Sequence, residues 1–297
     1  MTVTDTPTRL LRASARRSYD PDVDIDWAAT PDDELWWMQP ERTSLYGTDL
    51  WHGLAPQQQR ELVKHETASI VHMGWWFEVL LMQGLLKEVY AGDPRDPRVQ
   101  FLLTEIGDEC RHSTMFGRAM ETAGAPSYGP PLLVRRLAGV GGFVLRGPTL
   151  YAGALLVEET LDRWQRESMH DERLQPLTRM VNRIHVTEEA RHVTFARDEL
   201  ARAMPRLSRA ERRWHQLITA QNAYVAMRCL VNPQVYASVG LDPSEARKVA
   251  MHNPQYRATI AWMGEKVMPF LTEHGLVSDR DRKIWRGSFL LKEPSTA

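Results

Sequence analysis

Several features that mark large protein classes are scarce in this chain. Its 297 residues include only two cysteines, Cys110 and Cys229, and the formal net charge is -1. Two cysteines so far apart cannot form a disulfide framework or hold an iron–sulfur cluster. A charge near zero gives no broad basic surface. We therefore expect no nucleic-acid partner and no electrostatic attraction to an anionic membrane.

Long apolar runs are also missing. The charge-free stretch "GPTLYAGALLV" (residues 147–157) is too short to cross a bilayer at the helical rise of about 1.5 Å per residue. The first twenty residues contain no apolar segment typical of a secretory signal. No G-x-G-x-x-G follows a strand-like run, so no nucleotide-binding loop is predicted. We expect a cytoplasmic protein without a membrane span.

The pattern that is present is helical. No alternating runs with hairpin turns occur. Short segments rich in Pro, Gly and Asp separate long stretches that contain no helix breaker. This predicts an all-α fold with four long helices in the middle of the chain and further helices toward the C-terminus. The expected helices cover residues 56–90, 98–123, a weaker stretch reaching Leu145, 148–170, a stretch ending at Met204, 208–230, 243–252 and 256–274.

The first part of the chain lacks this helical pattern. Residues 1–54 are rich in Pro, Asp and Thr and show little periodicity, which predicts an extended N-terminal arm. Four tryptophans in this arm indicate that it packs on the rest of the protein: Trp27, Trp36, Trp37 and Trp51. Residues 55–297 are expected to form a single helical domain.

Two predicted helices carry the same short motif, Glu-x-x-His. It occurs as Glu109 with His112 and again as Glu189 with His192, and residues three apart lie on one face of a helix. His185 shares the face of the second pair. One such motif alone is usually a solvated helix face. Helix bundles that hold two iron or manganese ions, however, take Glu-x-x-His from two helices and one Glu from each of two others.

The remaining two long helices offer candidates for the single glutamates. Glu78 lies in the apolar run "GWWFEVLLMQGLL" at about the same distance from the connecting loop as Glu109, whereas Glu66 is roughly 18 Å farther along the helix. The other helix offers Glu158 and Glu159. Its apolar neighbours favour Glu158, although spacing alone leaves Glu159 open. Buried unpaired carboxylates are costly, so several converging on one core require cations.

At this point the sequence resembles a known family, the AurF-type diiron N-oxygenases, which include the p-aminobenzoate N-oxygenase. The resemblance runs from "DIDW" (residues 24–27) through "IWRGSF" and is carried by "WWFE", "DECRH", "LLVEET" and "HVTEEARH". It implies a ferritin-like four-helix bundle with one extra histidine ligand, which matches His185. The implied metal ligands are Glu78, Glu109, His112, Glu158, His185, Glu189 and His192.

The resemblance also implies a chemistry. Two iron ions, for which manganese can substitute on the same ligands, would activate O2 to oxidise an amine nitrogen, an arylamine first of all, to hydroxylamine or nitro. An external electron donor of the ferredoxin or reductase type would re-reduce the metals, and a homodimer is expected. Glu188 and Arg191 are candidates for supporting charges beside the ligands.

Two other functions stay open on the sequence alone. A diiron hydroxylase or desaturase could use the same ligands to oxidise carbon in a lipid-like or other hydrophobic substrate. A metal-handling protein without catalysis is the third possibility, but the extra histidine and the bulky aromatics around Trp75 and Trp76 argue against iron storage.

Overall fold

The computed structural model describes residues 5–16, 18–141 and 145–291, and this part of the chain is almost entirely helical. The all-α prediction is confirmed, since the described residues form no sheet and only an isolated bridge between Trp36 and Leu174. The elements in chain order are α1 (Thr6–Arg16), α2 (Pro21–Asp24), η1 (Pro40–Arg42), α3 (Asp49–His52), α4 (Pro56–Tyr90), α5 (Pro97–Ala123), α6 (Leu132–Gly141), α7 (Pro148–Ser168), α8 (Pro176–Ala203), η2 (Met204–Arg206), α9 (Arg209–Cys229), η3 (Pro233–Val239), α10 (Pro243–His252), α11 (Pro254–Met263), α12 (Val267–Glu273), η4 (Asp279–Asp281) and α13 (Arg282–Gly287).

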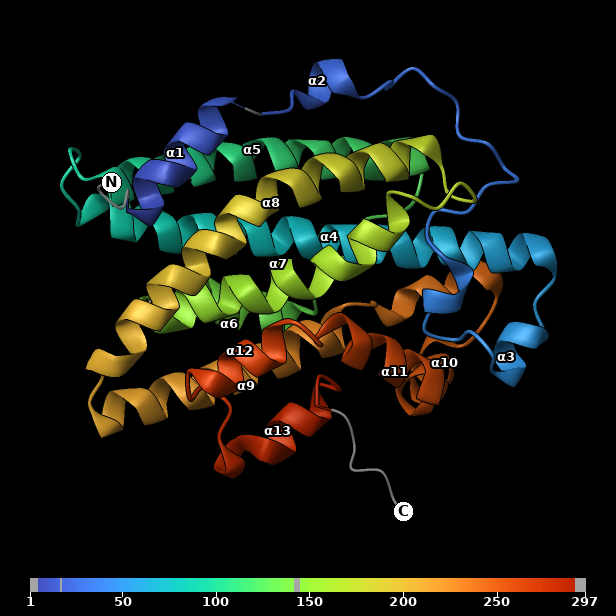
Figure 1. Cartoon of the computed structure of the whole chain (residues 1–297). Coiled ribbons are helices and arrows are strands. Elements are labelled where there is room, and N and C mark those ends of the chain that lie inside the picture. Colours follow the sequence, from blue (N-terminus) through green and yellow to red (C-terminus); the bar gives the residue numbers. More distant parts are fainter. Residues whose placement is uncertain (1–4, 17, 142–144, 292–297) are drawn as a thin grey trace.

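Four of these helices form the bundle. Helix α4 packs along α5, and α7 packs along α8; α5 also contacts α8, and α4 contacts α7, which closes the four helices around a common interior (Figure 1). Helices α9, α11 and α12 lie against α7, so the C-terminal part of the chain covers that side of the bundle.

Local sequence signals explain where the helices begin and end. Seven of the α-helices in the described part of the chain start with proline, whose missing N–H belongs to a position that has no partner inside a helix. Asp96 caps α5 by accepting a hydrogen bond from Arg98 N at 2.8 Å, and Gly124 ends it in the left-handed conformation. Ser208 and Glu211 form a capping box that opens α9, where each side chain accepts a hydrogen bond from the backbone N–H of the other residue.

The N-terminal arm differs in part from the prediction. Residues 6–16 form helix α1, which packs on α5 and α8, where the sequence analysis expected extended chain. This short helix is strongly amphipathic and buries Pro7 and Leu10, a periodic signal that the sequence prediction overlooked. The arm then runs over the bundle, and Trp37 and Trp51 are buried at 8% and 5% exposure.

The predicted helix 256–274 is wrong in one respect, because the structure divides it into α11 and α12. Gly264 ends α11, and a side chain at this position would meet Leu290 at 2.8 Å. Pro269 explains the break: inside a continuous helix it would remove a hydrogen bond, whereas here it lies in the first turn of α12. The helix expected to reach Leu145 ends at Gly141 within the described residues; residues 142–144 lie outside them.

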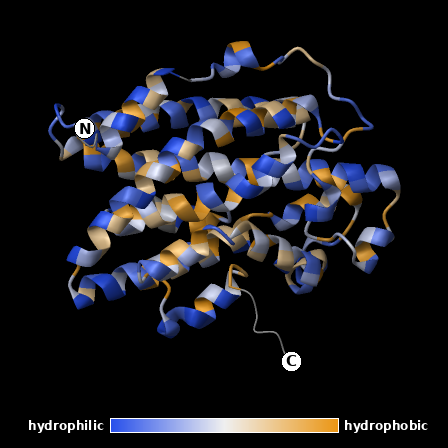
Figure 2. Ribbon diagram, in the orientation of Figure 1, coloured by the Kyte–Doolittle hydropathy of each residue, from blue (hydrophilic) through white to orange (hydrophobic). Residues whose placement is uncertain are grey.

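The bundle interior is not uniformly apolar. Hydrophobic and hydrophilic residues alternate along the bundle helices, as expected for helices with one buried side (Figure 2). Yet glutamate and histidine side chains from all four bundle helices are buried in the middle. Among the described residues, no helix combines the length and apolarity that a bilayer crossing requires. The buried acidic residues therefore call for a local explanation.

Candidate metal centre

The structure brings all seven residues proposed from the sequence into one buried cluster. Helix α4 contributes Glu78 and α7 contributes Glu158, while α5 and α8 contribute the two Glu-x-x-His pairs together with His185. None of the seven is more than 3% exposed. Their oxygen and nitrogen atoms form overlapping groups in which three donors lie close enough to share one metal ion.

One half of the cluster is built by the two Glu-x-x-His pairs. His112 Nδ1 lies 3.0 Å from Glu109 Oε2 and 3.3 Å from Glu189 Oε1. His192 Nδ1 lies 3.0 Å from Glu109 Oε1 and 3.0 Å from Glu189 Oε1. Both imidazoles therefore turn Nδ1 toward the two glutamates between them, an arrangement in which carboxylates can bridge two cations.

The other half is built around His185. This residue presents Nε2 to the cluster, 3.2 Å from Glu78 Oε1, 3.7 Å from Glu158 Oε2 and 3.9 Å from Glu189 Oε1. Its ring also lies beside that of His112, with centroids 4.8 Å apart. The extra histidine thus joins the glutamates of α4 and α7 to the pairs on α5 and α8.

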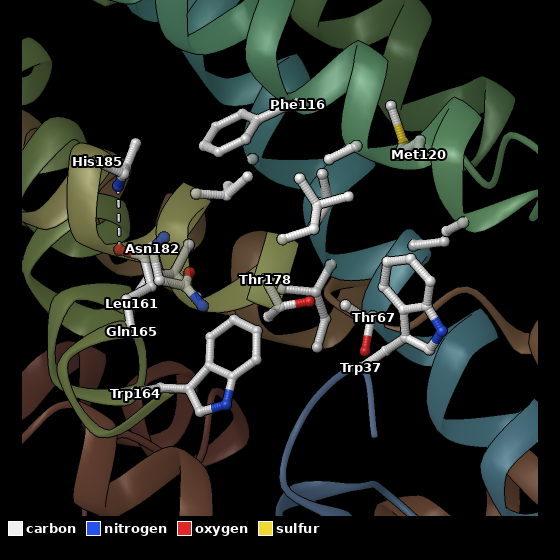
Figure 3. Close-up of a pocket in the computed structure, with 18 of the residues that line it drawn as sticks. Trp37, Thr67, Phe116, Met120, Leu161, Trp164, Gln165, Thr178, Asn182 and His185 are labelled. Atoms are coloured by element: carbon white, nitrogen blue, oxygen red, sulfur yellow. Dashed lines mark hydrogen bonds between the residues drawn. The ribbon is translucent and has the colours of Figure 1, made fainter. Parts of the chain in front are cut away.

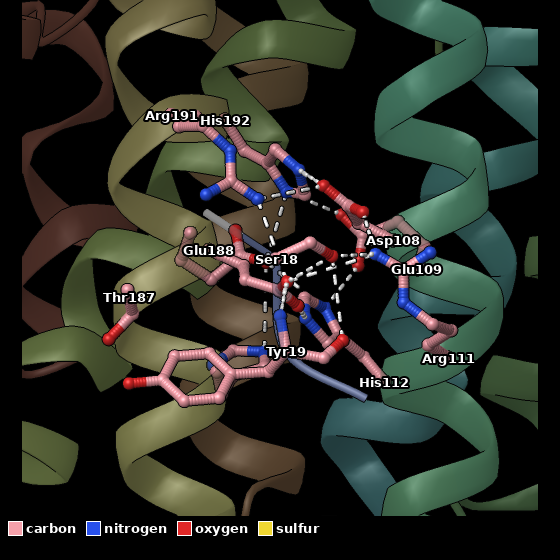
Figure 4. A network of polar contacts seen from close by, with 12 residues as sticks. Ser18, Tyr19, Asp108, Glu109, Arg111, His112, Thr187, Glu188, Arg191 and His192 are labelled. Carbon is pink, nitrogen blue, oxygen red and sulfur yellow. Dashed lines mark hydrogen bonds and ion pairs between the residues drawn. The ribbon is translucent and has the colours of Figure 1, made fainter. Parts of the chain in front are cut away.

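The outward nitrogens of two histidines meet carboxylates from the opposite helix. His112 Nε2 lies 2.9 Å from Glu188 Oε2, and His192 Nε2 lies 3.2 Å from Asp108 Oδ2 (Figure 4). Each carboxylate comes directly before a motif glutamate, so the two helices exchange equivalent contacts. A carboxylate in this position fixes the ring tautomer with its proton outside and leaves Nδ1 free to bind metal.

Charged and polar groups close this outer side. Arg191 donates a hydrogen bond to Asp108 at 3.1 Å, and Arg111 also contacts Asp108. From the N-terminal arm, the backbone N–H of Tyr19 donates to Glu188 Oε1 at 3.1 Å, and Ser18 contacts the same oxygen (Figure 4). Asp108 was not among the site residues predicted from the sequence. The repeated pattern of an acid, Glu, any residue, Arg and His in both helices was the signal that could have identified it.

The third histidine has a different partner. His185 Nδ1 donates to the amide oxygen of Gln165 on α7 at 3.0 Å (Figure 3). Sequence reasoning missed Gln165, because a lone glutamine on another helix carries no spacing signal. Glu105 was also missed: it is 2% exposed and its carboxylate lies near Glu109 and His192, one helical turn before Glu109.

The structure also separates the competing glutamates. Glu159 points away from the cluster, and its carboxylate accepts a hydrogen bond from Arg197 Nε at 3.1 Å. Glu66 is buried elsewhere on α4, where Ser44 donates to both of its oxygens. Cys110 is exposed and lies against Met82. None of these three belongs to the cluster.

In the metal-free cluster, the pKa values of the glutamates are shifted in opposite directions. Burial, together with the neighbouring Glu109 carboxylate, raises the pKa of Glu78 well above its usual range, and burial also raises that of Glu158. Burial acts in the same direction on Glu189, but His192 and His112 outweigh it and hold the Glu189 pKa well below its usual range. Protons and imidazolium charges then supply the positive charge that the carboxylates require.

The donor set fits a pair of divalent cations better than it fits protons. Among the described residues, the buried Oε2 atoms of Glu78 and Glu189 have no hydrogen-bond partner, which is unfavourable unless a cation contacts them. Four glutamate carboxylates carry the charge that two divalent ions neutralise. Imidazole and carboxylate donors together suit iron and manganese.

Comparison with known proteins agrees with this geometry. A family model described as p-aminobenzoate N-oxygenase AurF matches residues 2–275. The chain belongs to the AurF family. This family is one of diiron N-oxygenases, and membership indicates an oxygenase at the level of the family. The buried Glu and His groups of this chain could bind metal ions.

Curated relatives extend the similarity over nearly the whole chain. The uncharacterized protein Rv0885 of Mycobacterium tuberculosis is 29% identical over 293 residues, covering 93% of this chain and 84% of its own length. The uncharacterized protein Mb0909 of Mycobacterium bovis is similar to the same extent. Neither name states a substrate, so the AurF-family site itself has to indicate what the chain does.

Proposed function

We propose that this AurF-family chain is an O2-dependent diiron oxygenase that oxidises the nitrogen of an amine to hydroxylamine or nitro. The observation that carries the proposal is the convergence of four buried carboxylates and three imidazoles on one cluster with unpartnered carboxylate oxygens. The proposed ligands are Glu78, Glu109, His112, Glu158, His185, Glu189 and His192.

Two iron ions held by these residues would supply O2 activation and the electrons for oxygen transfer. The chain's own residues prepare the site. Glu188 and Asp108 hold the outward protons of His112 and His192, and Gln165 does the same for His185, so each imidazole keeps a lone pair on its inward nitrogen. Glu188 and Arg191 were suggested by the sequence as supporting charges. In the proposal Glu188 supports His112 directly, and Arg191 supports His192 through its hydrogen bond to Asp108.

A small cavity adjoins the inner side of the cluster. It has a volume of about 50 Å³, and its mostly apolar lining includes Glu78, Glu158 and His185. Figure 3 shows His185 at one end of this cavity and Trp37 at the other. Its few uncharged polar groups include Gln165 and Asn182. Apolar walls keep bulk water away from the reacting atoms, which strengthens electrostatic interactions and protects oxidising species from side reactions.

The family name refers to p-aminobenzoate, an arylamine with a carboxylate. Binding that carboxylate would call for a free cationic side chain. Lys64 is the one Lys or Arg among the described residues that line the small cavity, and its Nζ already pairs with Glu61 at 2.8 Å. We therefore propose an amine substrate whose recognition does not depend on a carboxylate. An external donor would supply the electrons that re-reduce the metals.

The test combines metal analysis with product analysis. The purified protein should contain about two irons per chain, and the same analysis measures manganese. After chemical reduction and exposure to O2 with a panel of amines and lipids, mass spectrometry should find hydroxylamine or nitro products. Products oxidised only on carbon would replace the proposal with a hydroxylase or desaturase. Metal content far below about two per chain would remove the oxygenase proposal altogether.

A further inference from the structure

A second and larger cavity lies on the other side of α7. It has a volume of about 280 Å³ and is bounded by residues of α4, α6, α7 and α9. Trp76 and Leu80 of α4 line one wall, and Ile218 and Val225 of α9 line another. The sequence motif "WWFE" thus contributes side chains both to the metal centre and to this cavity.

The large cavity is partly open to solvent, and its lining is mostly apolar. Apart from Glu158, none of the described residues that line it carries a charge, and the other polar side chains are Gln221 and Asn222 of α9. Walls of this kind offer water few hydrogen bonds, and binding sites for small molecules are typically lined in the same way, by apolar side chains with a few polar groups. An apolar ligand is therefore the expected occupant.

One position on α7 independently keeps this space open. Gly153 lies inside the helix, where glycine costs stability relative to alanine. A side chain built there would meet no atom within 4 Å, so close packing does not require the glycine. What the glycine preserves is room in the cavity.

Size and position connect the large cavity to the metal centre. The small cavity, at about 50 Å³, is well below the roughly 150 Å³ of an apolar cavity that binds benzene, whereas the large one exceeds it. Val157 and Glu158 line both. Of these two cavities, the large one has space for a substrate larger than a single ring, and it lies next to the proposed metal ligand Glu158.

We infer that the large cavity binds the body of an uncharged hydrophobic amine, whose nitrogen is directed past Glu158 toward the metals. Gln221 and Asn222 would accept or donate hydrogen bonds to a polar group at the α9 end. The binding of an apolar, uncharged molecule follows from the cavity alone; its identity as the substrate rests on the proposed function.

Two fluorescent probes with the same rings test the cavity without turnover. N-phenylnaphthylamine is an uncharged aromatic amine, and anilinonaphthalene sulfonate adds one negative charge to the same skeleton. The iron-loaded protein should bind the uncharged probe saturably, one per chain, and the sulfonate at least about tenfold more weakly. Equal binding of the two probes, or no saturable binding of the uncharged one, would overturn the inference.

Matched variants locate the binding. Gly153→Leu should weaken binding of the uncharged probe by at least about tenfold, because the new side chain fills the cavity. Gly117→Leu is the control: a side chain there would also meet no atom within 4 Å, but Gly117 lies on α5 and lines neither cavity. Val225→Phe fills the same space from α9 and should weaken binding of the uncharged probe in the same way. It replaces Gly153→Leu if that variant does not fold. Circular dichroism and metal content establish folding in each case.

The outcomes separate this inference from the oxygenase proposal. Amines that are oxidised in the product screen should displace the uncharged probe. If they are oxidised without displacing it, or if all variants bind the probe alike, the cavity inference is wrong and the oxygenase proposal stands. If the probe binds as expected but no amine is oxidised, the cavity is a binding site and the proposed reaction is wrong.

Discussion

Glu66 and Glu78 lie on the same helix, are equally buried, and differ in what surrounds their carboxylates. Ser44 donates to both oxygens of Glu66, through its backbone N–H at 2.9 Å and its hydroxyl at 2.6 Å. One oxygen of Glu78 contacts His185 Nε2 at 3.2 Å, and the other accepts no hydrogen bond from the described residues. The carboxylate of Glu66 thus has hydrogen-bond donors within the protein, whereas that of Glu78 has an oxygen available to a metal ion. Burial alone thus does not identify a metal ligand.

The largest expected effect comes from removing each acid in turn. Glu78→Ala should reduce bound iron from about two per chain to about one or fewer and abolish O2-dependent oxidation, because the α4 ligand is lost. Glu66→Ala should retain the iron but lower the free energy of unfolding by about 1–3 kcal/mol, since it leaves the backbone N–H of Ser44 buried without its hydrogen-bond partner. Metal analysis and urea denaturation measure the two effects. Iron loss in Glu66→Ala, or full iron retention in Glu78→Ala, would reverse the assignment.

The same comparison predicts how stability depends on pH. Burial raises the pKa of Glu66 from 4.5 to about 7, and the hydrogen bonds from Ser44 only partly oppose this. Between these values the folded protein keeps a proton that the unfolded chain has released. The stabilising contribution is therefore complete below pH 4.5 and is lost as the pH rises through about 7. The loss should be about 3 kcal/mol.

Glu66→Gln provides the reference for this measurement. Subtracting its free energy of unfolding from that of the wild type cancels the other titrating groups, and iron-loaded protein keeps the metal-site carboxylates out of the transition. The difference should fall by about 3 kcal/mol between pH 4.5 and 8. A difference that stays constant over this range would show that Glu66 is charged in the folded protein.

The sequence predicted the framework of the site because the relevant signals are local. Breakers such as Pro97 and Pro148 delimit the long helices, and a helix of known rise places Glu78 level with Glu109. The preference for Glu158 over Glu159 came from the apolar character of neighbouring positions. The structure agrees with that preference, since Glu159 turns to Arg197 outside the cluster.

Contacts between helices could not be predicted in the same way. Gln165 reaches His185 only because α7 and α8 have a particular rotation about their axes, which spacing along one helix does not specify. The crossed contacts of Asp108 and Glu188 likewise depend on how α5 faces α8. The two cavities lie between helices, and their shapes follow from side-chain packing that no single segment encodes.

Asp108 is a third kind of buried acid and extends the comparison between Glu66 and Glu78. Asp108 is neither satisfied by backbone donors nor left open: it accepts from His192 and from Arg191. Burial alone would raise its pKa, but these partners hold the pKa at about 2, so Asp108 stays charged at every working pH. Its charge should make His192 a stronger metal ligand by favouring the proton on the outer nitrogen.

Asp108→Asn keeps the shape of the side chain and removes that charge. The variant should bind iron about 10- to 100-fold more weakly, as should Glu188→Gln at His112, and the factor should not change between about pH 6 and 8 because neither acid titrates there. Competition with a chelating dye measures the affinity. Glu159→Gln is the matched control, since it removes a buried carboxylate that pairs with Arg197 and touches no histidine of the cluster. If all three variants bind iron equally, pairing with a histidine does not affect the metals, and Asp108 belongs with Glu66 as an acid that only stabilises the fold.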